Sequence, residues 1–233
     1  MRTGTKTCES LARRPARRSV LSAVLALAVA LLPPAAGAQP PAGVPRAEIR
    51  LATPEEAAKL IRDEEDAIKA EPPVGGLSRA ASYYLRTRLP NLAPLTPDHA
   101  TKENLRFTTT ELHQFSPFAC VGDFDGNGLE DIALVARDRT TQKLKLLALH
   151  QVNVNWNVGG LTSKSYHPYT IVEGGAVAPG AKLDDLLVVC EKPGRFESVD
   201  GGVTLGLRHH SIRYGFSLYY FLAGRYQELL IGD

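Results

Sequence analysis

GDFDGNGLED, residues 122–131, is followed without a break by the apolar run IALVA at 132–136. Gly126 and Gly128 let the backbone curve tightly, because glycine adopts left-handed conformations at little steric cost. A hard divalent cation takes six to eight oxygen ligands at about 2.3–2.6 Å, and calcium is the ion that such loops suit best. The sequence therefore predicts a calcium-binding loop whose oxygen-bearing side chains stand at positions 1, 3, 5 and 9: Asp123, Asp125, Asn127 and Asp131.

Charge repulsion is the physical reason to expect a cation in this loop. The three aspartates within these nine residues disfavour one another's ionised state, and a bound cation reverses that effect. Magnesium is less suitable, because it is usually held by only one or two protein carboxylates. Zinc is not expected, because no His or Cys lies inside the loop. The alternative is a plain turn between two strands, in which Asp and Asn only cap the backbone.

The first six positions of the loop also match the start of an EF-hand, but the match ends there. Leu134 occupies the twelfth position, where an EF-hand requires a bidentate Glu. The run at 132–136 is short and contains β-branched residues, so a strand is expected after the loop instead of a helix.

Residues 118–134, FACVGDFDGNGLEDIAL, resemble the calcium loop of FG-GAP/VCBS-type repeats. The resemblance covers one hairpin, and the chain holds one copy of the motif. Because a propeller needs several four-stranded blades, an integrin-like propeller is excluded. The single loop and the ending after residue 217 are similar to those of small exported bacterial proteins. The resemblance implies that Ca²⁺ is bound by the side chains of Asp123, Asp125, Asn127 and Asp131 and by the carbonyl of Leu129.

Residues 1–38 predict a signal peptide. Four arginines precede an apolar run at 20–32, and an A-x-A cleavage site ends at Ala38. The apolar run is shorter than the roughly 17–25 residues of a membrane-spanning helix, so no transmembrane segment is expected in the mature chain. The arginine pair at 17–18 fits a twin-arginine signal, and a Sec signal fits almost as well. We therefore expect a periplasmic or secreted protein.

Net charge changes sign once the predicted signal peptide is removed. The full chain carries 27 Lys and Arg against 25 Asp and Glu. Residues 1–38 hold six of the basic and one of the acidic residues, which leaves 21 against 24. The remaining chain is slightly acidic, so a nucleic-acid partner is not expected.

The mature chain begins with segments that do not have strand character. Residues 39–52, rich in Pro and Ala, predict a flexible lead-in. Residues 53–105 predict a helical N-terminal extension. Its first helix starts with a capping box formed by Thr53 and Glu56, and a second helix is expected at 77–89.

Residues 106–233 predict a β-domain that carries the calcium loop at 123–131. Apolar residues follow a period of two, and turn signals separate eight to ten short runs. This pattern predicts a mainly β fold: an antiparallel β-sandwich or partial barrel with one or two N-terminal helices. The expected strands are one or two within 107–123, and then 131–137, 143–146, 152–158, 166–172, 184–191, 202–207, 212–220 and 226–231.

Two cysteines remain after the signal peptide, Cys120 and Cys190, each in an apolar strand. In an oxidising compartment they could form a disulfide that closes a loop of about 70 residues. Free cysteines buried in a core are an equally natural interpretation. The sequence leaves both alternatives open.

Catalysis is not expected, because no nucleophile, base and orienting group occur in a known motif. His209 and His210 are adjacent, so in a strand they would point to opposite faces. His150 and His167 are isolated and are expected to be structural. A carboxylate pair of the glycosidase type would have to come from Asp184, Asp185 and Glu191, and the first two more often cap the start of a strand.

The leading functional hypothesis is therefore an exported, non-catalytic β-domain that binds a structural calcium ion. The alternative is a protein- or glycan-binding module, such as an inhibitor of a cell-wall enzyme. Its partner would be an extracellular protein or glycan, recognised by exposed tyrosines such as Tyr166, Tyr169 or Tyr219.

Overall fold

The computed structural model of the chain describes residues 53–155, 162–184 and 186–231. The predicted signal peptide and lead-in lie outside these residues, as does the end of the strand predicted at 152–158. Within the described segments, none of the helices is long and apolar enough to cross a membrane.

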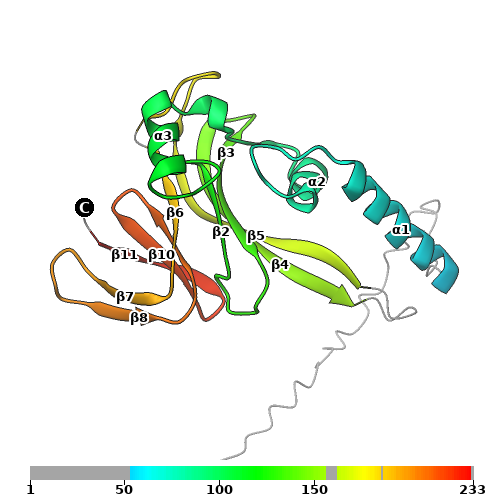
Figure 1. Ribbon diagram of the computed structural model, residues 1–233. Helices are drawn as coiled ribbons and strands as arrows, with labels where there is room; N and C mark the ends of the chain where they lie inside the picture. Colours follow the sequence, from blue (N-terminus) through cyan, green and yellow to red (C-terminus); the bar gives the residue numbers. More distant parts are fainter. Residues whose placement is uncertain (1–52, 156–161, 185, 232–233) are drawn as a thin grey trace, which may run out of the picture. The chain divides into compact units, whose positions relative to one another are not determined.

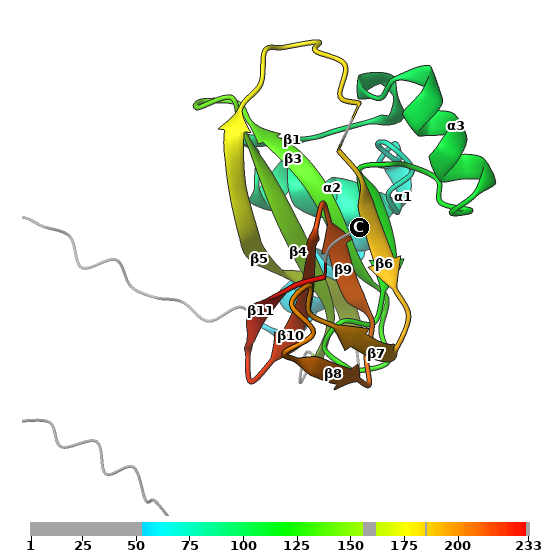
Figure 2. The same cartoon turned by 90° about the vertical axis from the view of Figure 1, so that its left-hand side faces the viewer.

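Within the described residues, antiparallel strands form three sheets (Figures 1 and 2). The first has the order β1-β3-β4-β5, with β2 also paired to β3, and the second has the order β11-β10-β9-β6. Strands β7 and β8 form a separate hairpin. The prediction of a mainly antiparallel β fold with N-terminal helices is confirmed, and among the described sheets none closes into a barrel. The strands are β1 (Leu92–Pro94), β2 (Ala119–Gly122), β3 (Asp131–Asp138), β4 (Lys143–Asn155), β5 (Thr162–Ala176), β6 (Val188–Glu191), β7 (Gly194–Glu197), β8 (Thr204–Leu207), β9 (Ser211–Tyr214), β10 (Ser217–Leu222) and β11 (Arg225–Leu230).

Helices α1 (Pro54–Ala70) and α2 (Arg79–Arg88) occur where the sequence predicts them. Both hydrogen bonds of the capping box between Thr53 and Glu56 are present at the start of α1. Ser78 caps α2 by accepting a hydrogen bond from the Ala81 N–H at 3.2 Å. Side-chain caps satisfy N–H groups that the first turn of a helix leaves without partners, which explains why both helices begin at these residues.

Helix α3 (Lys102–Thr110) corrects the prediction of a strand from residue 107 onward, and it crosses the predicted boundary at 105–106. The three threonines at 108–110 favour a strand by propensity. The helix forms because Thr101 caps it and because Asn104 donates a hydrogen bond to the carbonyl of Leu186 at 3.1 Å. The second contact is long-range, so local sequence could not indicate it.

Strand β3 is buried on both faces. Ala133 and Val135 belong to the core between the first and second sheets. The alternate residues Ile132, Leu134 and Ala136 belong to a second core, which Leu77, Ala81 and Leu85 complete from α2 and the turn before it. Figures 1 and 2 show α2 and the four-stranded sheet on opposite sides of β3 and β4. The two-sided burial explains why the run after the loop is apolar without alternation.

Two strands, β9 and β10, replace the single strand predicted at 212–220. The chain turns at Gly215, whose φ of 59° lies in the left-handed region that glycine tolerates best. The following hairpin turns at residues 223–224, as predicted, with Leu222 paired to Arg225. Apolar alternation continued across Gly215, so periodicity alone did not reveal the break.

A disulfide joins Cys120 on β2 to Cys190 on β6 and so connects the first and second sheets. The Val188 N–H donates to the Pro117 carbonyl at 2.8 Å, which adds a backbone link between the same two segments. Cys120 lies three residues before Asp123, so the covalent link lies next to the start of the loop.

Helix α2 should contribute to the stability of the β-sheet core. We expect Leu85→Ala to lower the free energy of unfolding by about 2–4 kcal/mol, because a side chain that is only 2% exposed leaves a cavity. Leu60→Ala on α1, where the side chain is 63% exposed, is the matched control and should cost less than about 0.5 kcal/mol. Urea unfolding followed by circular dichroism measures both. Equal effects would show that α2 does not pack on the sheet.

Reduction of the Cys120–Cys190 disulfide should destabilise the fold. The cysteines are 70 residues apart, and the chain-entropy model gives about 4 kcal/mol for a loop of this length. We expect dithiothreitol to lower the melting temperature of the wild type. The double variant Cys120→Ala, Cys190→Ala should already melt at the lower temperature and should not respond to reductant. An unchanged melting temperature of the reduced wild type would contradict this prediction.

Candidate metal centre

The β2–β3 loop, residues 123–130, is anchored in the core by Phe124. This side chain is 1% exposed and packs in the cluster between the first and second sheets. Gly126 and Gly128 both have φ of 79°, which is the left-handed conformation that the sequence predicts for them. The loop is therefore a tight turn held by an apolar anchor.

Asp123 and Asn127 use side-chain oxygens to hold the backbone of the loop. The two carboxylate oxygens of Asp123 accept hydrogen bonds from the N–H groups of Gly126 at 2.8 Å and Gly128 at 3.1 Å. The Asn127 Oδ1 accepts from the Leu129 N–H at 2.7 Å. These are the capping contacts expected of a plain turn. Each oxygen accepts one hydrogen bond here and has a second lone pair for a cation.

Asp131 is a fully buried carboxylate at the start of β3. Its Oδ2 accepts from the Phe124 N–H at 2.9 Å, and its Oδ1 accepts from the Gln151 N–H at 2.8 Å. Burial raises the pKa of Asp131 to about 6, and the negative charges of Asp125 and Asp123 act in the same direction. The two N–H donors oppose this shift only in part. The ionised form of Asp131 therefore lacks compensating positive charge.

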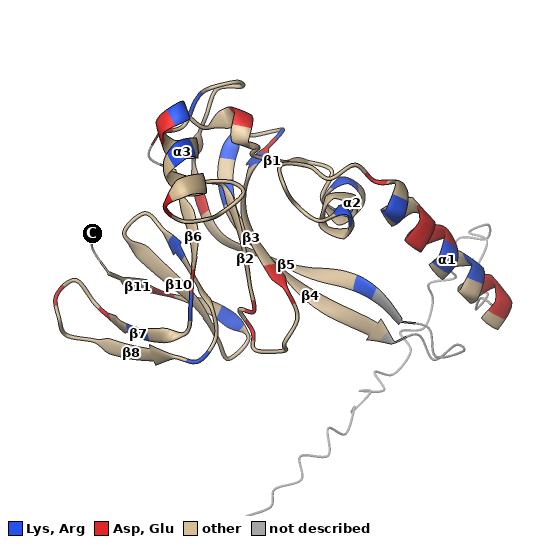
Figure 3. Cartoon of the chain, in the orientation of Figure 1, with Lys and Arg blue, Asp and Glu red and all other residues tan. Residues whose placement is uncertain are grey.

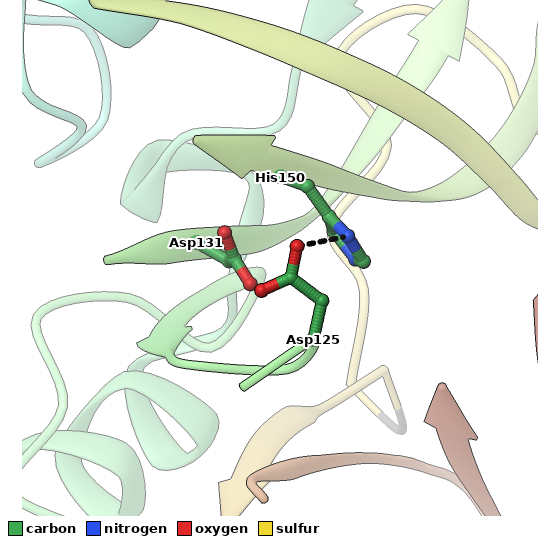
Figure 4. Close-up of side chains that lie close together, drawn as sticks. All are labelled: Asp125, Asp131 and His150. Atoms are coloured by element: carbon green, nitrogen blue, oxygen red, sulfur yellow. Dashed lines mark ion pairs between the residues drawn. The ribbon is translucent and has the colours of Figure 1, made fainter. Parts of the chain in front are cut away.

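Asp125, Asp131 and His150 form a group that we call the Asp–His cluster (Figure 4). One potential ligand atom from each residue lies within 4.8 Å of those from the other two. The Asp125 Oδ2 is 3.4 Å from the His150 Nδ1, and Figure 4 shows the other oxygen of Asp125 turned toward Asp131. The structure thus brings together two of the predicted ligands, and Asp123 is not a member of the cluster. Asn127 contacts the cluster, because its Nδ2 donates a hydrogen bond to the Asp125 Oδ2 at 3.1 Å.

His150 is a member of the cluster that the sequence analysis treated as an isolated structural residue. Strand β4 carries it, and Ile132 pairs with Leu149 across the two strands, so the next position places His150 opposite Asp131. Opposed residues in an antiparallel pair share a face. The structure therefore places beside Asp131 a histidine that the loop sequence does not contain. The strands predicted at 131–137 and 143–146 are joined by a polar turn. Pairing them as a hairpin and extending the second strand to residue 150 brings His150 opposite Asp131.

Burial lowers the pKa of His150, against the opposing attraction of Asp125. The His150 Nε2 lies 2.7 Å from the Tyr226 hydroxyl. At neutral pH the ring is therefore favoured in its uncharged form, with one nitrogen protonated and a lone pair on the other. A neutral imidazole can be a metal ligand, and it supplies no positive charge to the two carboxylates.

The segment between β8 and β9 lies against the loop. The Asp123 N–H donates to the His210 Nδ1 at 3.3 Å, and the His210 N–H donates to the Asp123 carbonyl at 3.0 Å. A methyl group placed on Gly126 would meet the His209 ring at 2.2 Å. The two histidines thus contact the backbone of the loop at different points.

Of the three tyrosines expected to be exposed for partner recognition, two are buried and Tyr169 is half-buried. Tyr166 and Tyr219 are 6% and 8% exposed, and Tyr169 packs on Phe221 and Tyr226. The expectation that Tyr166 and Tyr219 are exposed is therefore wrong, and recognition of a glycan or protein stays a prediction.

The suggested carboxylate pair finds no support in the described residues. Glu191 forms an ion pair with Arg213 at 3.0 Å, and residue 185 lies outside the described chain.

Comparison with known proteins does not assign a function to this site. No family model, no curated protein and no solved structure matches the chain. The likeness of residues 118–134 to FG-GAP/VCBS-type loops therefore remains a prediction that those residues alone carry.

The His209 contact with the loop can be tested with a matched pair of glycines. Gly126 and Gly128 have the same φ, but a methyl group on Gly128 would meet nothing within 4 Å. We expect Gly128→Ala to cost about 1–2 kcal/mol for the left-handed backbone alone. Gly126→Ala should cost more, because the His209 ring must also rotate away. Chemical denaturation measures both.

A double variant separates the two contributions. Adding His209→Ala to Gly126→Ala should restore its stability to that of Gly128→Ala, within about 0.5 kcal/mol. Equal costs of the two glycine substitutions in the presence of His209 would show that the ring does not restrain the loop.

Proposed function

We propose that the chain is an exported, non-catalytic β-domain whose β2–β3 loop binds a structural calcium ion. In this proposal the ligands are the side chains of Asp123, Asp125, Asn127 and Asp131 and the carbonyl of Leu129. The ion connects the loop to strand β3 and stabilises the folded state.

The observation that carries this proposal is the uncompensated negative charge at Asp131. Among the ion pairs of the described residues, none joins a carboxylate of the loop to Lys or Arg, and Asp125 pairs with His150 alone. Figure 3 shows acidic residues, in red, at the loop between β2 and β3. A divalent cation beside Asp125 and Asp131 would supply the missing positive charge and would favour both ionised forms.

The way in which the loop is held supports a stabilising role for the ion. Asp131 connects the loop to β4 through the Gln151 N–H, and the Asn127 Nδ2 donates to the Gln151 carbonyl at 3.0 Å. An ion that bound the carboxylates would strengthen the link between the loop, β3 and β4. Its contribution to stability would follow RT ln(1+[L]/Kd).

Export is supported by the signal-peptide pattern of residues 1–38 and by the Cys120–Cys190 disulfide. Disulfides form and persist in oxidising compartments and are rare in the cytosol. We therefore propose a periplasmic or secreted location, where calcium sites of extracellular modules bind with Kd of about 10⁻⁴–10⁻³ M.

Calcium should raise the stability of the protein by mass action. At a concentration one hundred times Kd, we expect a gain of about 2.7 kcal/mol in the free energy of unfolding. Calorimetric titration measures the affinity, and thermal unfolding with calcium or with a chelator measures the gain.

Asp125→Ala should abolish the calcium response, because it removes a ligand whose side chain is 19% exposed and contributes little to the core. Asp66→Ala on α1, where the side chain is 76% exposed, is the control and should respond like the wild type. Identical melting curves of the wild type with calcium and with chelator would exclude a calcium site.

A second candidate function, binding of an extracellular protein or glycan, is favoured by one surface. A cleft of about 630 Å³ lies between α3 and the β9–β10 turn, and it is lined by Phe107 and Phe216. These side chains are 47% and 59% exposed, which is unusual for large aromatic residues that serve only the core. Retention on a panel of cell-wall glycans that Phe216→Ala abolishes would support this candidate.

A further inference from the structure

His150 has an environment that packing alone does not explain. The side chain is 2% exposed, although its ring has two polar nitrogens. Buried polar groups are normally hydrogen-bonded, so each nitrogen needs a partner. The ring is surrounded by aromatic neighbours at centroid distances of 4.6 Å for Phe221, 4.7 Å for Tyr169, 5.6 Å for Tyr226 and 6.3 Å for Phe124.

The two nitrogens differ in how well they are satisfied. The His150 Nε2 has a good partner in the Tyr226 hydroxyl at 2.7 Å. The Nδ1 is 3.4 Å from the Asp125 Oδ2, which is longer than the 2.7–3.2 Å of well-formed N–H···O hydrogen bonds. Figure 4 shows this nitrogen directed toward the two carboxylates. A buried nitrogen with a weak partner thus points into a site of negative charge.

Tyr226 can support His150 as a metal ligand. A hydroxyl both donates and accepts, so it can accept a hydrogen bond from a protonated Nε2. That tautomer leaves the lone pair on Nδ1, which is the nitrogen that faces Asp125 and Asp131. Histidines that bind metals almost always donate the other ring N–H to an oxygen, which orients the ring.

We propose that the Asp–His cluster binds a first-row transition dication, such as Zn²⁺ or Mn²⁺, through Asp125, Asp131 and the His150 Nδ1. This inference rests on the proposed function to the extent that both use the carboxylates of Asp125 and Asp131, and the two kinds of ion would compete for these side chains. Calcium takes oxygen ligands, whereas imidazole nitrogen suits first-row transition ions. The loop itself contains no histidine, and strand β4 provides one from outside it.

The geometry of the cluster is compatible with such an ion. Ligands that lie about 2.0–2.2 Å from a tetrahedral ion are about 3.3–3.6 Å from one another. The separation of 3.4 Å between the Asp125 Oδ2 and the His150 Nδ1 is in this range. All three ligand atoms lie within 4.8 Å, so a small movement of the partly exposed Asp125 would complete the set.

Titration of the purified protein with Zn²⁺, Mn²⁺ and Ca²⁺ tests the proposal. The affinity of each ion is measured by calorimetry, and the imidazole ¹⁵N signals of the wild type report which ring binds. We expect zinc to bind with one site and to shift the His150 Nδ1 signal, with the proton on Nε2. This readout needs no substitution, so a variant that fails to fold does not affect it.

Substitutions then identify the ligands. We expect Asp125→Asn to lower zinc affinity at least about 10-fold and His150→Gln at least about 100-fold. His167→Gln is the matched control, because His167 pairs directly with His150 across β4 and β5 and its side chain is exposed. This control should leave zinc affinity unchanged.

Three results overturn the proposal, and they differ in what they imply for the calcium site. Calcium binding without a shift of the His150 signals by zinc or manganese would leave the calcium site and remove the transition-metal site. If His167→Gln abolishes zinc binding, the ion is bound at the exposed His167 and not at the Asp–His cluster. Failure of all three ions to bind would remove both sites.

Discussion

Burial of strand β3 on both faces is the constraint on which the rest of the structure depends. Its residues alternate between a core shared with the four-stranded sheet and a core shared with α2. Backbone groups in such a strand cannot reach water, so they must be paired on both edges. Strands β1 and β2 pair with one edge and β4 pairs with the other. The N-terminal helices are therefore part of the folded core, because without α2 one face of β3 would meet solvent.

The same burial accounts for the candidate metal centre. Asp131 is the first residue of β3, so the strand places its carboxylate where no water compensates the charge. Two backbone N–H groups satisfy its oxygens as hydrogen-bond acceptors, yet its pKa stays raised. Asp125 approaches it from the loop and His150 approaches from β4. The requirement for a cation thus arises from the position of a carboxylate in a covered strand, in addition to the acidic composition of the loop.

Local signals predicted those parts of the fold that local interactions determine. The capping box predicted the start of α1, and period-two patterns predicted most strands. The prediction was wrong at α3, where a long-range hydrogen bond from Asn104 to residue 186 opposes the strand propensity of three threonines. It was also wrong at Gly215, where the sequence alternation of apolar residues runs on through a turn, although pairing of Ile212 with Tyr219 shows that the inward-facing positions change there. In both places tertiary contacts decided what short-range preference left open.

The sequence by itself determined the spacing of the loop oxygens, the two glycines that permit the turn, and the apolar run that becomes β3. The tertiary structure alone decided which side chains share a centre: Asp123 and Asn127 hold the loop backbone, whereas Asp125 and Asp131 meet His150. The physical reason is strand register. Pairing of Ile132 with Leu149 places His150 opposite Asp131, and a shift of one residue would turn the ring to the other face. That register is set by packing on both faces of β3, which the loop sequence does not contain.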